Sequence, residues 1–176
     1  PNIQFSISFT TRPKRPTEEH GRDYFFVDKP EFERMVETGE FLEHAQVFDN
    51  YYGTSRRVVE ERMAESHDVL LEIDWQGAAQ VRKIMPEAVS IFILPPSRHE
   101  LERRLRARGT DSDEVIARRL QDAAGDMTHW RDFDYVVVNQ DFEQAVRELA
   151  AIMDGRGEAS RASRPELKPV ITSLLA

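Results

Sequence analysis

Two arginines and three hydroxyl residues lie close together near the start of the chain. Ser8, Thr10 and Thr11 precede Arg12, and Arg15 follows three residues later. A proline beside each arginine fixes the backbone φ angle, so this turn is partly ordered before anything binds. Planar guanidinium groups beside hydroxyls are charge-assisted, bidentate donors for a phosphate dianion. The pattern therefore indicates either a phosphate site or a solvated basic turn.

Two carboxylates follow the apolar run at residues 69–71. Glu72 and Asp74 are two residues apart, so both side chains would leave the same face of a strand. A carboxylate on an apolar strand costs free energy unless it is paired, binds a metal or emerges at the strand end. We therefore expect Asp74, at the end of the predicted strand, to be the better functional candidate, whereas Glu72 fits equally well as the partner of an arginine.

A second group of arginines surrounds Gly109. Its members are Arg98, Arg103, Arg104, Arg106, Arg108, Arg118 and Arg119. Arg104 and Arg108 share one helix face at i, i+4 spacing. Acidic residues are interleaved in this arginine group and allow ordinary surface ion pairs, which contribute little to stability; they are Glu100, Glu102, Asp113 and Glu114. The alternative is a helix–glycine–helix hairpin that closes over phosphates as a lid and brings positive charge to a phosphoryl group in transfer.

Four further polar residues lie in an aromatic-rich region. Tyr24, Glu43, Tyr52 and Thr54 would, taken by themselves, be interpreted as core or surface-turn residues of a small insertion. The five histidines show no metal-ligand spacing, and we interpret them as structural or surface residues.

The composition limits the class of protein. With 176 residues and 40% hydrophobic content, the chain is long enough for one domain with a proper core. The net charge of −8 argues against general affinity for nucleic acid or for anionic membranes. There is no cysteine, and no apolar run approaches the length of a membrane span. We therefore expect a soluble protein of the cytoplasm.

The first half of the chain carries short strand and turn signals. Alternating apolar residues predict a strand from Ile3 to Phe9 that runs into the basic turn. Further strands are predicted at 24–27 and 40–48, and a turn at 49–55. One helix is predicted to begin at Asp28 or Lys29 and to end at Gly39, and another is predicted to be capped by Thr54 or Ser55. This pattern indicates a small antiparallel insertion.

From Asp68 onward, apolar strands alternate with helices. Strands are predicted at 69–74, 89–94 and 135–139, and Ser97, Ser112 and Asp141 are predicted helix caps. Such alternation favours a parallel sheet that helices cover on both faces, with ligands at the carboxyl ends of its strands. Residues 155–160 are interpreted as a flexible linker, and 170–175 are apolar enough to dock on the chain or on another subunit.

Eight motifs occur in the order in which a known family carries them. They are Ser8-x-Thr10-Thr11-Arg12-x-x-Arg15, Gly21-x-Asp23-Tyr24, Phe41-Leu42-Glu43, Asn50-Tyr51-Tyr52-Gly53-Thr54, Ile73-Asp74-x-Gln76-Gly77, Pro95-Pro96-Ser97, Arg108-Gly109 and Val138-Asn139. Together they resemble guanylate kinase of the bacterial type, a nucleoside monophosphate kinase. The resemblance runs from about Ser8 to Met153.

The resemblance implies a P-loop kinase-type α/β fold. Its parallel sheet would be flanked by helices and would carry a small mixed or antiparallel GMP-binding insertion and a helical, arginine-rich lid. The implied domain covers 1–153, with the GMP-binding region at 8–60 and the lid at 97–120, and 154–176 form a linker and tail.

The resemblance also implies residue roles. The GMP phosphate would be held by Ser8, Arg12, Arg15, Tyr24 and Tyr52. Glu43 would accept hydrogen bonds from guanine N1–H and the 2-amino group, a donor pair that adenine lacks. Thr54, Glu72 and Asp74 would complete the guanine and metal side, with Asp74 acting on the metal indirectly; the family commonly has aspartate where this chain has Glu72. Arg104, Arg108 and Arg119 would be catalytic lid arginines, and Asn139, Arg104 and Arg108 would contact ATP.

The implied reaction transfers the γ-phosphoryl group of ATP, bound with Mg²⁺, to GMP in purine nucleotide metabolism. Positioning and charge neutralisation would catalyse it without a covalent intermediate. The alternative is an inactive guanylate-kinase-like module that binds other proteins. The nearly complete set of GMP residues favours the enzyme. No nucleic-acid or membrane partner is expected. Assembly into a homo-oligomer is one of the alternatives that the sequence leaves open.

The chain departs from the family in one respect. A guanylate kinase begins with a strand and a G-x-x-x-x-G-K-[ST] phosphate-binding loop, but no lysine follows any glycine here. The strand before that loop would belong in the middle of the sheet. We therefore expect neighbouring apolar strand residues to lack cover, these residues alone to be inactive, and the protein's own chain to start before Pro1.

Overall fold

The computed structural model describes residues 2–109 and 111–175 and divides the chain into two compact units, Pro1–Ala88 and Val89–Ala176. Each unit has hydrophobic clusters of its own. Phe32, Met35 and Phe41 form one cluster of the first unit, and Leu94 and Val136 belong to a cluster of the second.

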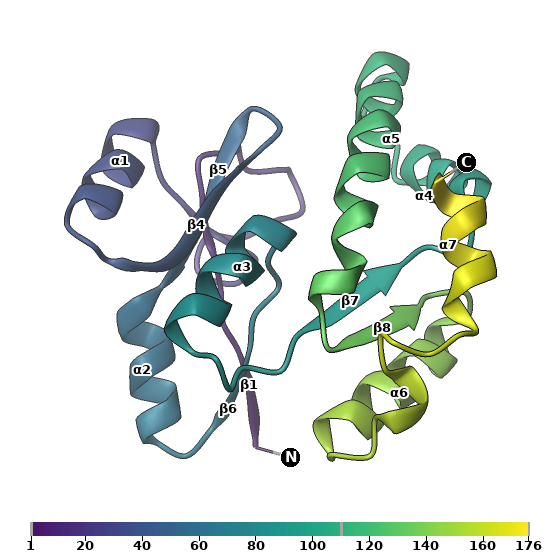
Figure 1. Cartoon of the computed structure of the whole chain (residues 1–176). Coiled ribbons are helices and arrows are strands. Elements are labelled where there is room, and N and C mark those ends of the chain that lie inside the picture. Colours follow the sequence, from purple (N-terminus) through teal and green to yellow (C-terminus); the bar gives the residue numbers. More distant parts are fainter. Residues whose placement is uncertain (1, 110, 176) are drawn as a thin grey trace. The chain divides into compact units, whose positions relative to one another are not determined.

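The first unit combines two sheets with three helices (Figure 1). Its elements are β1 (Ile3–Phe5), β2 (Phe9–Thr10), β3 (Phe25–Phe26), α1 (Lys29–Glu37), β4 (Phe41–Val47), β5 (Asn50–Ser55), α2 (Arg56–Ala64), β6 (Asp68–Leu70) and α3 (Trp75–Ile84). Strands β1 and β6 pair in parallel, and a mixed sheet has the order β3-β2-β5-β4. The predicted small insertion is this mixed sheet with α1.

The predicted strand from Ile3 to Phe9 is two strands in different sheets. β1 pairs with β6, and the Ser6 N–H still donates to the Leu70 carbonyl at 3.0 Å, whereas β2 pairs with β3 and β5. Alternation of apolar residues does not reveal a change of partner, so the prediction of one strand was wrong.

The predicted turn at 49–55 was also wrong, because Asn50–Ser55 is strand β5. The turn is the two residues Phe48 and Asp49, and Phe48 adopts a φ of 55°. Tyr51 and Tyr52 then pair with Gln46 and Ala45 of β4. Asp, Asn and Gly suggested a long turn, but tyrosines suit the half-buried surface of a sheet. Ser55 caps α2 as predicted, with its Oγ accepting from the Val58 N–H.

Strand β6 is shorter than predicted, because its partner β1 ends at Phe5. Glu72 and Asp74 therefore lie beyond the strand, in the segment that leads into α3. The prediction that they share a strand face was wrong.

The second unit contains a two-stranded parallel sheet and its helices (Figure 1). Its elements are β7 (Ile91–Leu94), α4 (Arg98–Ala107), α5 (Asp113–Met127), η1 (Thr128–Asp132), β8 (Tyr135–Val138), α6 (Phe142–Met153), η2 (Glu158–Ser160) and α7 (Leu167–Leu175). The side chains of Ser97, Ser112 and Asp141 accept from backbone N–H groups in the first turns of α4, α5 and α6, so all three predicted caps are confirmed.

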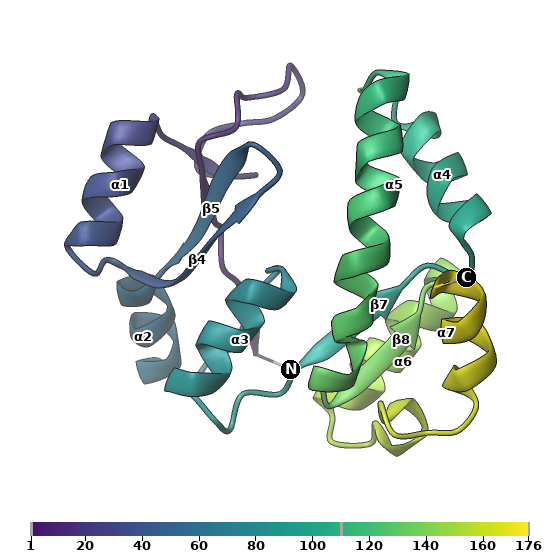
Figure 2. The same ribbon diagram turned by 45° about the horizontal axis from the view of Figure 1, so that its top comes forward.

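The C-terminal segment packs on its own unit, as Figure 2 shows for α7. Leu167, Ile171 and Leu174 are buried in one cluster with Leu94 and Val136. The segment 155–160, interpreted as a flexible linker, includes η2, and its Ser160 is 5% exposed. Glycine and serine suggested flexibility, but a Cβ on Gly157 would lie within 3.0 Å of the Ile152 and Tyr135 side chains, so this glycine allows close packing.

Some apolar strand residues are exposed. Phe5 and Leu70 are 52% and 44% exposed in the first unit, and Ile93 of β7 is 53% exposed in the second.

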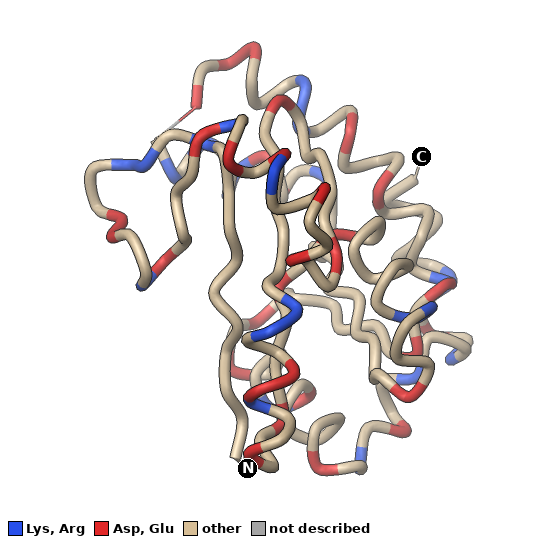
Figure 3. The backbone as a smooth tube through the Cα atoms, turned by 90° about the vertical axis from the view of Figure 1, so that its left-hand side faces the viewer, with Lys and Arg blue, Asp and Glu red and all other residues tan. Residues whose placement is uncertain are grey.

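Acidic and basic residues are interspersed along the backbone (Figure 3). Within residues 2–109 and 111–175, no helix has both the length and the apolar character needed to cross a membrane.

Candidate active site

The basic turn after β2 holds its two arginines around one carboxylate. Arg12, whose side chain is 13% exposed, donates from Nη2 to Glu18 Oε1 over 2.7 Å and from Nη1 to the Pro13 carbonyl over 2.9 Å. The Arg15 guanidinium lies 3.6 Å from the same Glu18 oxygen, and the Arg15 N–H donates to the other at 2.8 Å. Two guanidinium groups thus converge on one anion, so the turn is ordered and not merely solvated.

Glu18 is a residue that the sequence analysis missed. Its own N–H donates to the Arg15 carbonyl at 3.1 Å, so the two residues close the turn from both sides. The hydrogen bond from Arg12 holds the pKa of the Glu18 carboxyl below its usual range. The i, i+3 spacing of Arg15 and Glu18 was the available signal, but the same spacing is common in surface ion pairs.

Aromatic side chains support the arginine clamp. The Arg12 Cζ atom lies 5.4 Å from the centre of the Tyr24 ring, and the Tyr24 and Tyr52 ring centres are 6.0 Å apart. Burial and then the negative charge of Glu72 raise the pKa of the Tyr24 hydroxyl. Tyr24 therefore keeps its proton at neutral pH and can donate it in a hydrogen bond to an anion.

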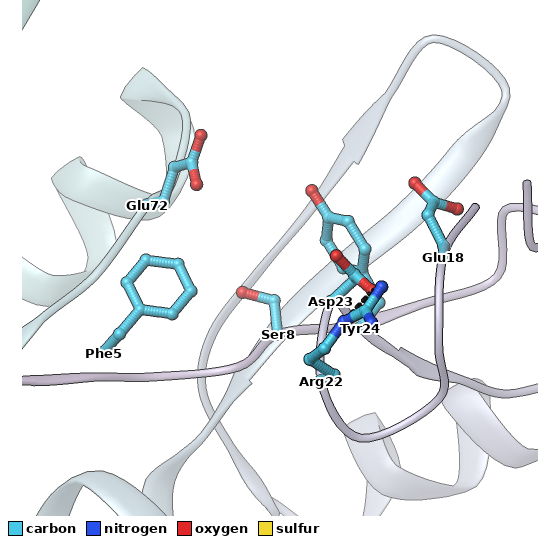
Figure 4. A pocket seen from close by; sticks show the side chains of 7 residues that line it. All are labelled: Phe5, Ser8, Glu18, Arg22, Asp23, Tyr24 and Glu72. Atoms are coloured by element: carbon cyan, nitrogen blue, oxygen red, sulfur yellow. Dashed lines mark hydrogen bonds and ion pairs between the residues drawn. The ribbon is translucent and has the colours of Figure 1, made fainter.

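A cavity of about 250 Å³ opens beside this clamp. It brings together three of the predicted residues, Ser8, Tyr24 and Glu72, and Figure 4 shows the Ser8 side chain between Glu72 and Tyr24. Its other lining residues, which the sequence analysis did not single out for a site, are Phe5, Glu18, Arg22 and Asp23. The hydroxyls of Ser8 and Tyr24 and the exposed carboxylate of Glu72 thus line one space, whereas Arg12, Arg15 and Tyr52 are not among its lining residues.

A buried carboxylate lies on the β4–β5 hairpin. A register shift between Phe41 and Glu43 sets Glu43 opposite Thr54, and the Thr54 Oγ1 hydroxyl donates to Glu43 Oε1 over 2.5 Å. Glu43 is 4% and Thr54 0% exposed. Irregular pairing of this kind often re-aims a side chain at a site. Since an isolated buried carboxylate is costly, Glu43 is a strong functional candidate.

Asp74 is the N-cap of α3. Its Oδ1 accepts from the Gly77 N–H at 2.9 Å and its Oδ2 from Gln76 Nε2 at 2.8 Å. Helix capping accounts for an acidic residue at this position. Among the described residues, no group of three histidine or acidic side chains is arranged to hold a metal.

Burial raises the pKa of the Glu43 carboxyl to about 7, and the charge of Asp74 adds to this effect against the Thr54 hydrogen bond. A carboxyl whose folded pKa is raised destabilises the fold progressively as the pH rises through that value. We expect Glu43→Gln to raise the free energy of unfolding by about 2 kcal/mol more at about pH 8 than at about pH 5. Urea unfolding of the variant and of the unchanged chain at both pH values measures this difference. A gain in unfolding free energy that is the same at both pH values would contradict the prediction.

In the second unit, three predicted residues line one cavity of about 190 Å³. Arg104, Arg108 and Asn139 share it with apolar residues of β7, α4 and the loop between them. Arg104 donates from Nη1 to the Asn139 carbonyl at 2.9 Å and from Nε to Glu100 at 2.7 Å. Apolar walls with guanidinium and amide groups suit a flat, hydrogen-bonding ring.

The predicted hairpin around Gly109 is formed by α4 and α5, and Gly109 has a φ of 63°. Arg103 and Arg106 make exposed ion pairs with neighbouring acidic residues, as in the surface-pair interpretation. Arg119, 21% exposed, forms an ion pair with Asp111 at 3.0 Å. The hairpin thus combines surface pairs with Arg104 and Arg108, which face the cavity.

The family model described as Guanylate kinase matches residues 2–156. The chain belongs to the guanylate kinase family. Curated guanylate kinases of Hydrogenovibrio crunogenus, Methylococcus capsulatus and Escherichia coli K12 are 61%, 52% and 53% identical to it. The first alignment covers 85% of this chain and 73% of the relative, and the others cover 99% of the chain and 86% and 84% of the relatives.

A solved structure supports the guanylate kinase assignment. The crystal structure of guanylate kinase from Anaplasma phagocytophilum matches with a TM-score of 0.77 and 39% identity, over 98% of this chain and 85% of that one. The predicted fold class, a P-loop kinase-type α/β fold, is confirmed. The resemblance stated from the eight motifs is confirmed as well.

Proposed function

We propose that this protein is an ATP:GMP phosphotransferase, a guanylate kinase that produces ADP and GDP. Two features of the first unit carry the proposal. An ordered two-arginine clamp suits the phosphate of a nucleotide, and the buried Glu43–Thr54 pair suits the guanine edge. The family membership supports the same conclusion.

We assign the acceptor side to GMP. Ser8, Arg12, Arg15, Tyr24 and Tyr52 hold its phosphate, and Thr54, Glu72 and Asp74 support the base that Glu43 reads. Thr54 occupies Glu43 Oε1, which leaves the carboxylate with acceptor capacity for N1–H and the 2-amino group. Adenine offers no such pair of donors, so the site prefers guanine.

We assign the donor side to ATP. Arg104, Arg108 and Asn139 contact the nucleotide, and Arg104, Arg108 and Arg119 neutralise charge on the phosphoryl group in transfer. A GMP phosphate oxygen forms a bond to the γ-phosphorus while the bond to the bridging oxygen of ADP breaks. Mg²⁺ enters as part of the Mg–ATP substrate. The GMP region is 8–60 and the lid 97–120, in a protein of the cytoplasm that serves purine nucleotide metabolism.

A coupled assay of ADP formation tests the proposal. The 176 residues contain no G-x-x-x-x-G-K-[ST] loop, so the assay uses these residues preceded by a segment that supplies one. We expect ADP to form from ATP with GMP and far more slowly with AMP. GMP binding without any ADP formation would contradict the enzyme and favour the inactive module. Equal rates with GMP and AMP would contradict the assignment of Glu43.

A further inference from the structure

Helix α3 packs directly against the strand that carries Glu43, as Figures 1 and 2 both show. We propose that Gly77 and Gln80 of α3 are positioning residues for the Glu43 carboxylate and thereby set the preference for guanine over adenine. This inference rests on the proposed function and concerns how the same site is built.

Gln80 fixes α3 on the backbone of β4 beside Glu43. Its Oε1 accepts from the His44 N–H at 3.1 Å, and its Nε2 donates to the His44 carbonyl at 2.7 Å. β4 is an edge strand of its sheet, so one side-chain amide here takes the place of a neighbouring strand. Gln76 adds a bond from Nε2 to the Gln46 carbonyl at 3.2 Å. These bonds fix the register between helix and strand.

Gly77 lies on the same helix face, against the Glu43 carboxylate. A Cβ atom at this position would overlap Glu43 Oε2 and would lie 3.0 Å from Glu43 Cδ and 3.3 Å from Ile73 Cβ. Gly77 is buried, and its φ is not in the left-handed region, so backbone conformation does not demand glycine here. Glycine is required at this position because the Glu43 carboxylate lies so close to the helix backbone.

The other contacts of Glu43 leave it little freedom to yield. Thr54 holds Oε1 from the β5 side at 2.5 Å, and Gly77 lies against Oε2 from the helix side. The carboxylate is therefore held between a hydroxyl and a helix backbone. A methyl group on Gly77, or loss of the Gln80 bonds, displaces Glu43 relative to a bound base, and hydrogen bonds weaken steeply with misalignment.

The test compares Gly77→Ala and Gln80→Leu with the unchanged chain and with Gly125→Ala as the matched control. Gly125 is also a helical glycine, and its added Cβ would have nothing within 4 Å among the described residues. Dissociation constants for GMP, AMP and ribose 5-phosphate are measured by calorimetry. Ribose 5-phosphate reports the phosphate clamp without the base, and urea unfolding confirms that each variant is folded.

We expect both α3 variants to lower the GMP-to-AMP affinity ratio by about tenfold, roughly the loss of one charge-assisted hydrogen bond. Their affinity for ribose 5-phosphate should stay within about twofold of that of the unchanged chain, and so should the affinities of Gly125→Ala for all three ligands. In a Glu43→Ala background, Gly77→Ala should change the ratio no further, because its effect passes through Glu43.

Two outcomes would overturn the inference. One is an unchanged affinity ratio in folded Gln80→Leu and Gly77→Ala; the other is an equal effect of Gly77→Ala with and without Glu43. If Gly77→Ala does not fold, the result for Gln80→Leu decides. Failure of the proposed function is distinguishable, because it shows without any substitution in α3: either no ADP forms in the coupled assay or the unchanged chain has no preference for GMP.

Discussion

Glu43→Ala should lower the preference for GMP over AMP by about 100-fold or more. The carboxylate is buried and, apart from the Thr54 hydrogen bond, can accept both guanine donors. Each hydrogen bond to a charged group is worth about 1.5–3 kcal/mol, and the loss of two reaches this factor. The ratio of dissociation constants for GMP and AMP measures the effect, with ribose 5-phosphate binding expected to be unchanged.

The matched control for this variant is Glu33→Ala. Glu33 is an exposed glutamate of the same unit whose contact with Lys29 is a loose ion pair at 3.7 Å. Its replacement should leave the GMP-to-AMP ratio unchanged. If Glu43→Ala retained the full preference for GMP, another residue would have to read the base.

Arg12→Met should weaken GMP binding by about 100-fold. Methionine keeps much of the apolar packing against Tyr24 but removes the charge and the planar donors of the clamp. AMP and ribose 5-phosphate should lose affinity by the same factor, because the clamp holds the phosphate and not the base. Calorimetric titration of the three ligands therefore separates this effect from that of Glu43→Ala.

Arg57→Met is the control for Arg12→Met. Arg57 is 77% exposed on α2 and pairs with Glu61, so its loss should leave all three affinities within about twofold. Arg12→Lys should recover only part of the lost affinity, because an ammonium cannot reproduce a planar fork. An Arg12→Met variant that lost affinity for GMP alone would contradict a phosphate role.

The sequence was sufficient for much of the fold because its signals are local. Asp28, Ser55, Ser97, Ser112 and Asp141 each accept the backbone N–H that a helix start leaves unpaired. Those caps could be predicted from residue type and from the apolar pattern that follows. The ordered motifs then identified the family without any knowledge of the three-dimensional contacts.

The errors concern contacts between distant segments. Nothing in the pattern from Ile3 to Phe9 shows that β1 and β2 have different partners. Residues 155–160 were interpreted as a linker because glycine and serine suit loops, yet Gly157 is where the backbone packs against Ile152. Which strand or helix a segment meets depends on the whole chain, and local propensity does not contain that information.

The same distinction applies to the site. Glu43, Arg12 and Tyr24 were proposed as site residues because they stand in the family's motifs. Glu18, by contrast, carries no motif signal and becomes visible only as the carboxylate between two arginines. Gln80 became visible only through its bonds to His44. Supporting residues are identified by geometry, because their chemistry alone is ordinary.

The most direct test is a calorimetric titration of this chain with GMP and, separately, with AMP at about pH 8, where Glu43 is ionised. We predict that GMP binds at least about 100-fold more tightly than AMP, since two donors meet the buried carboxylate. Equal binding of the two nucleotides, or binding of neither by the folded chain, would contradict a guanine-selective phosphate site in the first unit.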